Sequence, residues 1–317
     1  MILVTGSSGF VGSALVKRLS DNFFSIKAAS RNPNPNNDSA YVHCVKNGEI
    51  NGDTDWSNIL NEVEVVIHVA GHAHSSGARN ANALNVYRNI NTFGTLNLAR
   101  QAQEKGVKRF IYISSIKVNG ESTANAKPFY ETDIPAPRDY YGLTKYEAEQ
   151  GLLELASKTN MEVVIIRPPL VYGPGVRANF LALFQLVCLG IPLPFGSIKN
   201  KRSLLYIENL TDLIQVCISH REAKNRIFLA SDSQDISTSE LLVKMGIALN
   251  RPAYLFYAEP IVRAMAFLFR KSHAVDKLFG SLEVNVDFTR EVLGWLPPVS
   301  LDDGLRLTAE YFLAKRS

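Results

Sequence analysis

Five short apolar stretches recur along the first half of the chain, separated by segments with helical spacing of apolar residues. They are ILVTG, FSIKAAS, VEVVIHVAG, KRFIYISS and MEVVIIRPP, at residues 2–6, 24–30, 63–71, 108–115 and 161–169. Apolar residues run through these stretches with little polar alternation, which indicates strands that are covered on both faces. Such strands alternating with helices predict an α/β fold, a doubly wound parallel sheet of the Rossmann type.

A glycine turn follows the first strand, in TGSSGFVGSALVKRL. Gly6 permits a tight turn, Gly9 lets backbone N–H groups approach a pyrophosphate, and Gly12 allows the next helix to pack closely on the strand. A glycine pattern that follows a strand and opens a helix is typical of dinucleotide binding.

After residue 170 the predicted elements become shorter and are separated by glycine- and proline-rich stretches, namely GPG, GIPLPFG and GWLPPVS. A single later stretch, RSLLYIENLTDLIQVCISH at 202–220, has the pattern of a strand and a helix that return to the first domain. We therefore expect a dinucleotide-binding domain over residues 1–170 with a return segment at about 204–222. A smaller α+β substrate-binding lobe is expected from residues 171–203 and 223–317.

Composition excludes several classes of protein. The chain has 317 residues, 46% of them hydrophobic, and a net charge of +4 that is too small and too dispersed to predict nucleic-acid binding. Its three cysteines show neither metal spacing nor a disulfide framework, which favours a reducing cytoplasm: Cys44, Cys188 and Cys217. The first strand leaves no room for a signal peptide.

No membrane span and no metal site are expected. The late apolar stretch Ile261–Phe269 is interrupted by Arg263 and falls short of the ~20 residues that cross a bilayer, so we expect an amphipathic helix there. His68, His72 and His74 invite a metal hypothesis, but no carboxylate or cysteine stands near them, and we expect a cleft-lining or structural role.

Tyr141 and Lys145, in YYGLTK, stand four residues apart at the start of a helical pattern. Residues at this spacing lie on one face of a helix, so a phenol and an ammonium can address the same small molecule. The same spacing also occurs by coincidence on ordinary surface helices, and the rest of the chain has to decide between the two interpretations.

Several motifs occur in a characteristic order along almost the whole chain. They are HVAG, INTFGTLNLA, YISSIKVNGE, YGLTK, RPPLVYGPG, RANF, NKRSLLYIENLTD and VLGWLPP, together with the GxxGxxG spacing of the first turn. In these motifs the sequence resembles the extended short-chain dehydrogenase/reductases, the NAD-dependent epimerase/dehydratase family. The motifs are specific for the superfamily and its fold, and much less specific for the substrate.

The resemblance implies a catalytic trio of Ser115, Tyr141 and Lys145. The tyrosine would transfer the proton of a sugar hydroxyl, and the serine would hold the same oxygen. The lysine, which would also bind the nicotinamide ribose, and the oxidised nicotinamide would together lower the pKa of the phenol by about three pH units from ~10. The related 4,6-dehydratases carry an aspartate and a glutamate directly after the hydroxyl residue, where this chain has Ile116 and Lys117. We therefore exclude dehydration.

The cofactor-binding residues that the resemblance implies are Gly6, Gly9, Phe10, Val11, Gly12, Ser30, Arg31, Glu49, Ile50, Val69, Ala70, Gly71, Asn91, Ser114, Tyr141, Lys145, Pro168 and Pro169. Asp53 is a rival of Glu49 for the adenine. The second strand ends at Ser30 and Arg31 instead of an acidic residue, which favours NADP(H) because a guanidinium suits a 2′-phosphate. NAD(H) binding stays open, with Arg31 stacked on the adenine.

The resemblance further implies a UDP-sugar substrate, held by Lys117, Tyr172, Asn179 and Arg202, with Gly280–Leu282 near an N-acetyl group. We expect hydride transfer at C4 of a UDP-hexose or UDP-N-acetylhexosamine, and we favour a UDP-4-keto-6-deoxy-N-acetylhexosamine reductase of bacterial surface-polysaccharide (O-antigen) assembly. The alternatives are a UDP-glucose or UDP-N-acetylglucosamine 4-epimerase with bound NAD, and a non-catalytic dinucleotide sensor. A homodimer is usual for this superfamily and is expected here.

Overall fold

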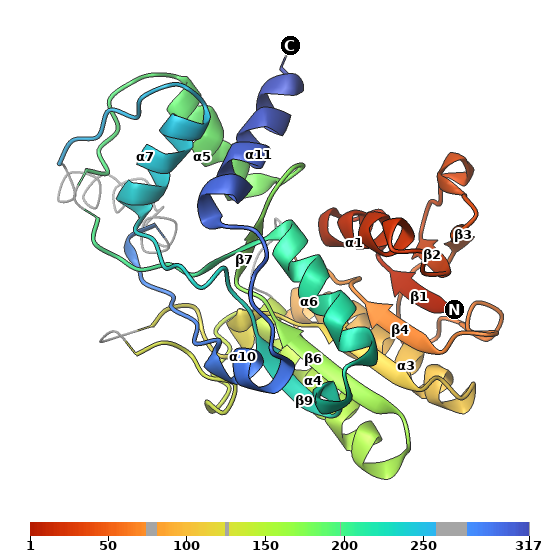
Figure 1. Ribbon diagram of the computed structural model, residues 1–317. Helices are drawn as coiled ribbons and strands as arrows, with labels where there is room; N and C mark the ends of the chain where they lie inside the picture. Colours follow the sequence, from red (N-terminus) through yellow and green to blue (C-terminus); the bar gives the residue numbers. More distant parts are fainter. Residues whose placement is uncertain (74–80, 124–126, 197, 258–277, 317) are drawn as a thin grey trace.

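A seven-stranded parallel sheet forms the centre of the protein (Figure 1). The computed structural model describes residues 1–73, 81–123, 127–196, 198–257 and 278–316. The strand order is β3-β2-β1-β4-β5-β6-β9, and every pairing is parallel. The strands are β1 (Ile2–Thr5), β2 (Ile26–Ser30), β3 (Val42–Lys46), β4 (Val65–His68), β5 (Arg109–Ile113), β6 (Glu162–Arg167) and β9 (Arg226–Leu229).

Helices cover both faces of this sheet, as continuous apolar strands require. Helices α1 (Phe10–Asp21) and α6 (Ile207–Ser219) pack side by side on one face, where their leucines meet alternate side chains of the strands. On the other face lie α3 (Gly94–Glu104) and α4 (Tyr140–Lys158), which bury Leu98 and Leu152. A short helix α2 (Ala81–Tyr87) and a π-helical turn η2 (Arg88–Phe93) lead directly into α3. The predicted doubly wound fold is confirmed.

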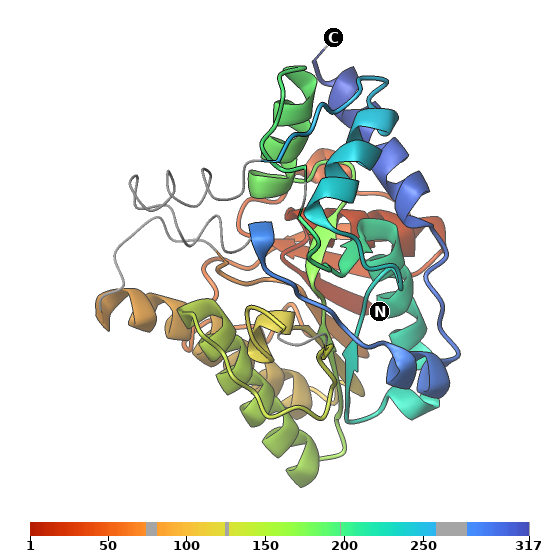
Figure 2. The ribbon, with the colours of Figure 1, turned by 90° about the vertical axis from the view of Figure 1, so that its left-hand side faces the viewer.

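A second lobe stands above the carboxyl ends of the strands (Figures 1 and 2). It contains α5 (Ala178–Cys188), α7 (Thr238–Ala248) and α11 (Leu301–Ala314), with a two-stranded sheet of β7 (Leu170–Tyr172) and β8 (Leu204–Tyr206) at its base. Aromatic rings fill its core, including Phe180, Phe184 and Phe312. The lobe is thus assembled from three separated parts of the chain.

The large sheet extends beyond the boundary expected from the sequence. Strand β9 lies at 226–229, after the expected end of the return segment at 222, and pairs with β6. Helix α10 (Asp287–Leu293) contacts β9, and Trp295 joins the core under α6, with its Nε1 donating to Asp212 at 2.8 Å. Both segments were expected in the second lobe, but their side chains complete the first domain.

Two strands carry a weaker pattern than the other five. Strand β3 is an edge strand whose side chains are mostly half-buried or exposed, and β9 is the opposite edge strand of four residues. Within the described residues, no helix combines the length and the apolar character needed to span a membrane. The stretch Ile261–Phe269, where we expect an amphipathic helix, lies outside those residues.

Candidate active site

A cavity of about 750 Å³ opens where the carboxyl ends of β1, β2, β4, β5 and β6 face the second lobe. Ligands of doubly wound folds bind at this edge of the sheet. The predicted residues that line it are Gly6, Gly9, Phe10, Val11, Gly12, Ser30, Arg31, Glu49, Ile50, Val69, Ala70, Gly71, Ser114, Ser115, Tyr141, Lys145, Pro168 and Pro169. The fold therefore gathers all but one of the expected cofactor residues, and the expected catalytic trio, around one space.

The glycine turn forms one wall of the cavity. Gly6 has a φ of +68°, and a Cβ atom there would lie 2.8 Å from the backbone of Ala70. A Cβ atom on Gly12 would lie 2.1 Å from the carbonyl oxygen of Gly6, so only glycine allows α1 to start this close to β1. Gly9 begins the helix, and no side chain caps it there. The first N–H groups of α1 therefore have no side-chain acceptor at the cap, and free N–H groups at a helix N-terminus favour the binding of an anion in the cavity.

The far end of the cavity is polar. Ser30 is buried at the end of β2, and Arg31 beside it is exposed. Asn47, which our sequence analysis missed, follows β3 directly and also lines the cavity, and its Oδ1 is buried without a hydrogen-bond partner among the described residues. Its place just after a strand of a parallel sheet was the signal that could have found it. Asp53, the rival of Glu49, is not among the lining residues.

Helix α4 presents Tyr141 and Lys145 to the cavity. Asp139 caps the helix by accepting a hydrogen bond from the Gly142 amide at 2.7 Å. Lys145 is 2% exposed, and its Nζ donates to the carbonyl oxygen of Ile113 at 2.9 Å and lies 4.5 Å from the ring centre of Tyr112. The tyrosine and lysine therefore share one face of the helix, at the end of β5.

The electrostatics of the pair differ from our expectation. Burial lowers the pKa of Lys145 to about 7, although Glu149 opposes this change. Burial raises the pKa of Tyr141, and the charge of Asp139 raises it further. The Lys145 Nζ lies 5.8 Å from the Tyr141 ring centre. In the ligand-free protein desolvation outweighs the neighbouring ammonium, so the expected activation of the phenol is not built into the chain alone.

Two serines end β5 beside this pair. Ser115 starts a short 3₁₀ turn, η3 (Ile116–Val118), and its Oγ accepts from the Lys117 amide at 3.3 Å. Ser114 is buried, and its Oγ has no hydrogen-bond partner within the described part of the chain. Both lie on the cavity wall, so an oxygen of a bound molecule can reach a hydroxyl near Tyr141.

Asn91 is the one expected cofactor residue that does not line the cavity. Its Oδ1 accepts from the His72 amide at 2.7 Å, and its Nδ2 donates to the His72 carbonyl and to Thr144, each at 3.1 Å. These hydrogen bonds occupy the amide group of Asn91 and connect the segment after β4 to α4. Asn91 lies in the π-helical turn η2, whose residues Asn89 and Ile90 line the cavity.

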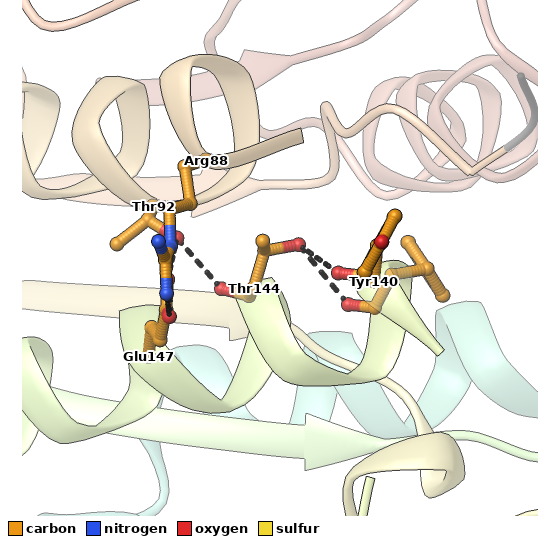
Figure 3. Close-up of polar contacts among 6 residues, drawn as sticks. Arg88, Thr92, Tyr140, Thr144 and Glu147 are labelled. Atoms are coloured by element: carbon orange, nitrogen blue, oxygen red, sulfur yellow. Dashed lines mark hydrogen bonds and ion pairs between the residues drawn. The ribbon is translucent and has the colours of Figure 1, made fainter. Parts of the chain in front are cut away.

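Other contacts hold α4 against η2, as Figure 3 shows. Arg88 forms an ion pair with Glu147 at 2.6 Å, and Thr92 donates to the carbonyl oxygen of Thr144 at 3.1 Å. The Thr144 hydroxyl in turn donates to the carbonyl oxygens of Tyr140 and Tyr141. The first turns of α4, which carry the tyrosine and lysine, are thereby fixed to the neighbouring elements.

Residues 2–230 match the NAD dependent epimerase/dehydratase family. A UDP-glucose 4-epimerase of Vibrio cholerae is 50% identical over 316 residues, which cover 98% of this chain and 95% of that protein. The chain belongs to the NAD-dependent epimerase/dehydratase family. Membership confirms the resemblance inferred from the motifs, and with it an enzyme of the extended short-chain dehydrogenase/reductase type that uses a nicotinamide cofactor.

Solved structures of similar fold have been obtained with either cofactor. MoeE5 in complex with UDP-glucose and NAD has a TM-score of 0.77 at 24% identity, covering 100% of this chain and 99% of that one. The structure of RMD from Pseudomonas aeruginosa complexed with NADPH has a TM-score of 0.76 at 21% identity, covering 99% of each. At these identities the likeness supports the fold, and the choice between NAD and NADP is a separate question.

The geometry of the cavity, taken without the comparisons, also fits a dinucleotide. Gly6 and Gly12 leave a cradle that a Cβ atom would fill, and the start of α1 offers uncapped N–H groups to a pyrophosphate. At the polar end, the unpaired Oδ1 of Asn47 is an acceptor suited to an amino group such as that of adenine. The residues present are therefore chemically matched to the cofactor.

Tyr172, expected in the sugar pocket, lies elsewhere. It is fully buried in the core of the second lobe, where its ring stacks on Phe180 at 5.1 Å and its hydroxyl donates to Asp232 at 3.0 Å. The expectation that it lines the sugar pocket is wrong. As the last residue of β7 it points toward α5 and α11, and the cavity is lined by its neighbour Val171 instead.

The other three expected substrate residues also stand outside the lining of the cavity. Asn179 is exposed in the first turn of α5. Arg202 is half-buried, and its Nη1 donates to the carbonyl oxygen of Gly280 at 3.0 Å. Lys117 forms an ion pair with Asp139. Lys117 is thus the one of the three that lies beside the catalytic trio, 5.7 Å from the Tyr141 ring centre, and the substrate contacts of all three residues stay predictions.

The histidines have separate environments. His68 is buried between Thr5 and Thr95, at 2.7 and 3.0 Å, and burial lowers its pKa to about 3. His72 lines the cavity, where its ring packs edge-on against Tyr87. Among the described residues no three His, Cys, Asp or Glu side chains group together as metal ligands, and His74 lies outside them.

Proposed function

We propose that this protein is a 4-epimerase of a UDP-hexose that retains an oxidised NAD. The observation that carries the proposal is the 50% identity to a UDP-glucose 4-epimerase over almost the full length of both chains. The convergence of Ser115, Tyr141 and Lys145 on one cavity is consistent with it. This proposal replaces our preference for a 4-ketoreductase, which rested on the residues near the 2′-hydroxyl of the cofactor.

The chain supplies the proton transfer and the orientation. A nicotinamide cofactor held by the glycine turn and the cavity wall would supply the hydride transfer from and to C4 of the sugar that a 4-epimerase needs. Tyr141 removes the proton of the C4 hydroxyl and later gives it back, and Ser115 holds the same oxygen by a hydrogen bond. Lys145, already buried beside the tyrosine, favours the ionised phenol whenever its amine is protonated.

The proposal is tested with protein purified without added cofactor. UDP-glucose and UDP-N-acetylglucosamine are supplied separately, and the C4 epimers are followed by proton NMR. We expect turnover of at least one substrate, and mass spectrometry of the denatured protein should release NAD. Tyr141→Phe should lose at least 100-fold in kcat, as expected when a general base is removed. Unchanged turnover in Tyr141→Phe would contradict the assigned chemistry and favour the non-catalytic sensor.

A second candidate is the 4-ketoreductase. Its support is the absence of an acidic side chain at the end of β2, where Ser30 and Arg31 line the cavity. A guanidinium at this place favours a 2′-phosphate and hence NADPH drawn from solution. Consumption of NADPH with a UDP-4-keto-6-deoxy-N-acetylhexosamine, without any epimerisation, would decide for this alternative. The cytoplasmic location, the homodimer and the role in polysaccharide assembly stay predictions.

A further inference from the structure

Lys117 stands between the two residues expected to hold the reacting hydroxyl. It lies in η3, two residues after Ser115, and its Nζ forms an ion pair with Asp139, the residue that caps α4, and a longer one with Glu121 at 3.9 Å. The second oxygen of the same carboxylate accepts from the Gly142 amide at 2.7 Å. One carboxylate therefore connects the lysine to the first turn of the helix that carries Tyr141.

The backbone of Lys117 makes two further contacts of the same kind. Its amide donates to the Oγ of Ser115 at 3.3 Å. Its carbonyl oxygen packs directly on α4, because a Cβ atom added to Gly142 would lie 2.7 Å from that oxygen. The serine turn and the tyrosine helix thus meet at Lys117 through its amide, its carbonyl and its ammonium.

The ammonium of Lys117 also lies within electrostatic reach of the phenol, 5.7 Å from the ring centre of Tyr141. Within the described part of the chain, the other charged groups that act on this ring are Lys145, on the same helix at 5.8 Å, and Asp139 at the cap. Tyr87 and Tyr112 face it from α2 and β5. Asp139 is the anionic member of this set and disfavours the phenolate, so the partner of Asp139 affects the phenol as well.

We propose that Lys117 is a positioning residue that holds Ser115 and Tyr141 in register and offsets the charge of Asp139 beside the phenol. The inference rests on the proposed function, because it takes the proton transfer by Tyr141 as given. Its rival is the role in substrate binding expected from the sequence, and the geometry favours the positioning role because Lys117 does not line the cavity.

The kinetic test uses Lys117→Met in the full-length enzyme, with the epimerase assay repeated from about pH 6 to 10. The pH at which kcat/KM reaches half its maximum should rise by about one unit, a loss of about tenfold at neutral pH. The effect is limited to this size because the lysine side chain is 32% exposed. The KM for the UDP-sugar should change less than twofold, and Lys117→Arg should recover most of the activity.

The matched control is Lys108→Met. It also breaks a lysine–carboxylate ion pair, with Glu64, but just before the start of β5, the strand whose far end leads into Ser115. Its pH profile should match that of the wild type. A rise in KM with unchanged kcat and pH profile in Lys117→Met would assign the lysine to substrate binding and overturn the proposal.

A second measurement separates this inference from the proposed function. In protein loaded with added NAD and labelled with ¹³Cζ-tyrosine, the Tyr141 signal is assigned by its loss in Tyr141→Phe and titrated by NMR; the positive charge of the nicotinamide counteracts the effect of burial on the pKa of the phenol. Lys117→Met should move this titration to higher pH, because an ammonium is lost and Asp139 is left without that partner. An identical titration overturns the electrostatic role even if epimerisation is found. Absence of epimerisation with a shifted titration leaves Lys117 in place and refutes only the proposed function.

Discussion

Replacing the buried Lys145 by methionine should stabilise the cofactor-free protein while removing its catalytic function. Burial lowers the pKa of Lys145 from 10.5 to about 7. Between these values the unfolded chain binds a proton that the folded chain does not bind, so the stability of the wild type falls as the pH is lowered through this window. At ~1.4 kcal/mol per pH unit, the penalty reaches about 4–5 kcal/mol below pH 7.

The substitution also removes favourable contacts. The Lys145 Nζ donates to the carbonyl oxygen of Ile113 at 2.9 Å and lies over the ring of Tyr112 at 4.5 Å. Losing one hydrogen bond and one cation–π contact costs about 2–3 kcal/mol. We therefore expect Lys145→Met to gain about 2 kcal/mol in free energy of unfolding near pH 6, and nothing near pH 9, where the penalty of the wild type has fallen to about 2 kcal/mol.

The assay is urea unfolding of cofactor-free protein at pH values near 6, 7.5 and 9. Lys127→Met, which removes an exposed lysine, controls for the loss of one positive charge and should unfold like the wild type at every pH. A Lys145→Met protein that is less stable than the wild type near pH 6, or whose advantage does not depend on pH, would refute the assignment of a costly buried ammonium.

Three other substitutions test the site and its support. Gly12→Ala should abolish retention of the cofactor, measured as nucleotide released on denaturation, because its Cβ would lie 2.1 Å from the Gly6 carbonyl oxygen. Arg31→Ala should weaken NADPH binding by at least tenfold and leave NADH binding unchanged, as followed by fluorescence titration; equal effects on both would assign the guanidinium to the adenine. Arg167→Met should cost about 3–5 kcal/mol in urea unfolding, since Glu149 then stays buried without its cation, and adding Glu149→Gln should recover part of the loss.

The sequence predicts best where one physical requirement acts alone. A strand covered on both faces needs continuous apolar residues, and this requirement located β1, β2, β4, β5 and β6. The two edge strands, β3 and β9, do not need a continuous apolar sequence. Each has a neighbouring strand on one side only, and β3 leaves much of its surface exposed. The end of the first domain was misplaced for the same reason, since β9 lies past it.

The site residues that the sequence predicts are those set by local geometry, and the ones it does not predict depend on long-range packing. Gly6 and Gly12 are predictable because backbone geometry alone demands them, and Tyr141 and Lys145 because helix spacing alone brings them together. Tyr172 depends on long-range packing, which no local pattern encodes: its hydroxyl meets Asp232, 60 residues later in the chain. The pKa of Tyr141 likewise depends on burial by several elements, which sequence spacing does not report.

The assembly of the second lobe from separated segments bears on how the protein is made. Its core unites Phe180 of α5, Leu242 of α7 and Leu305 of α11. During synthesis the large sheet can close once β9 has left the ribosome, whereas this core has to wait until α11, more than 70 residues later, has also been made. A chain that stops shortly before α11 should therefore still form the glycine turn after β1. Its second lobe, however, should expose apolar core residues and be sensitive to proteases.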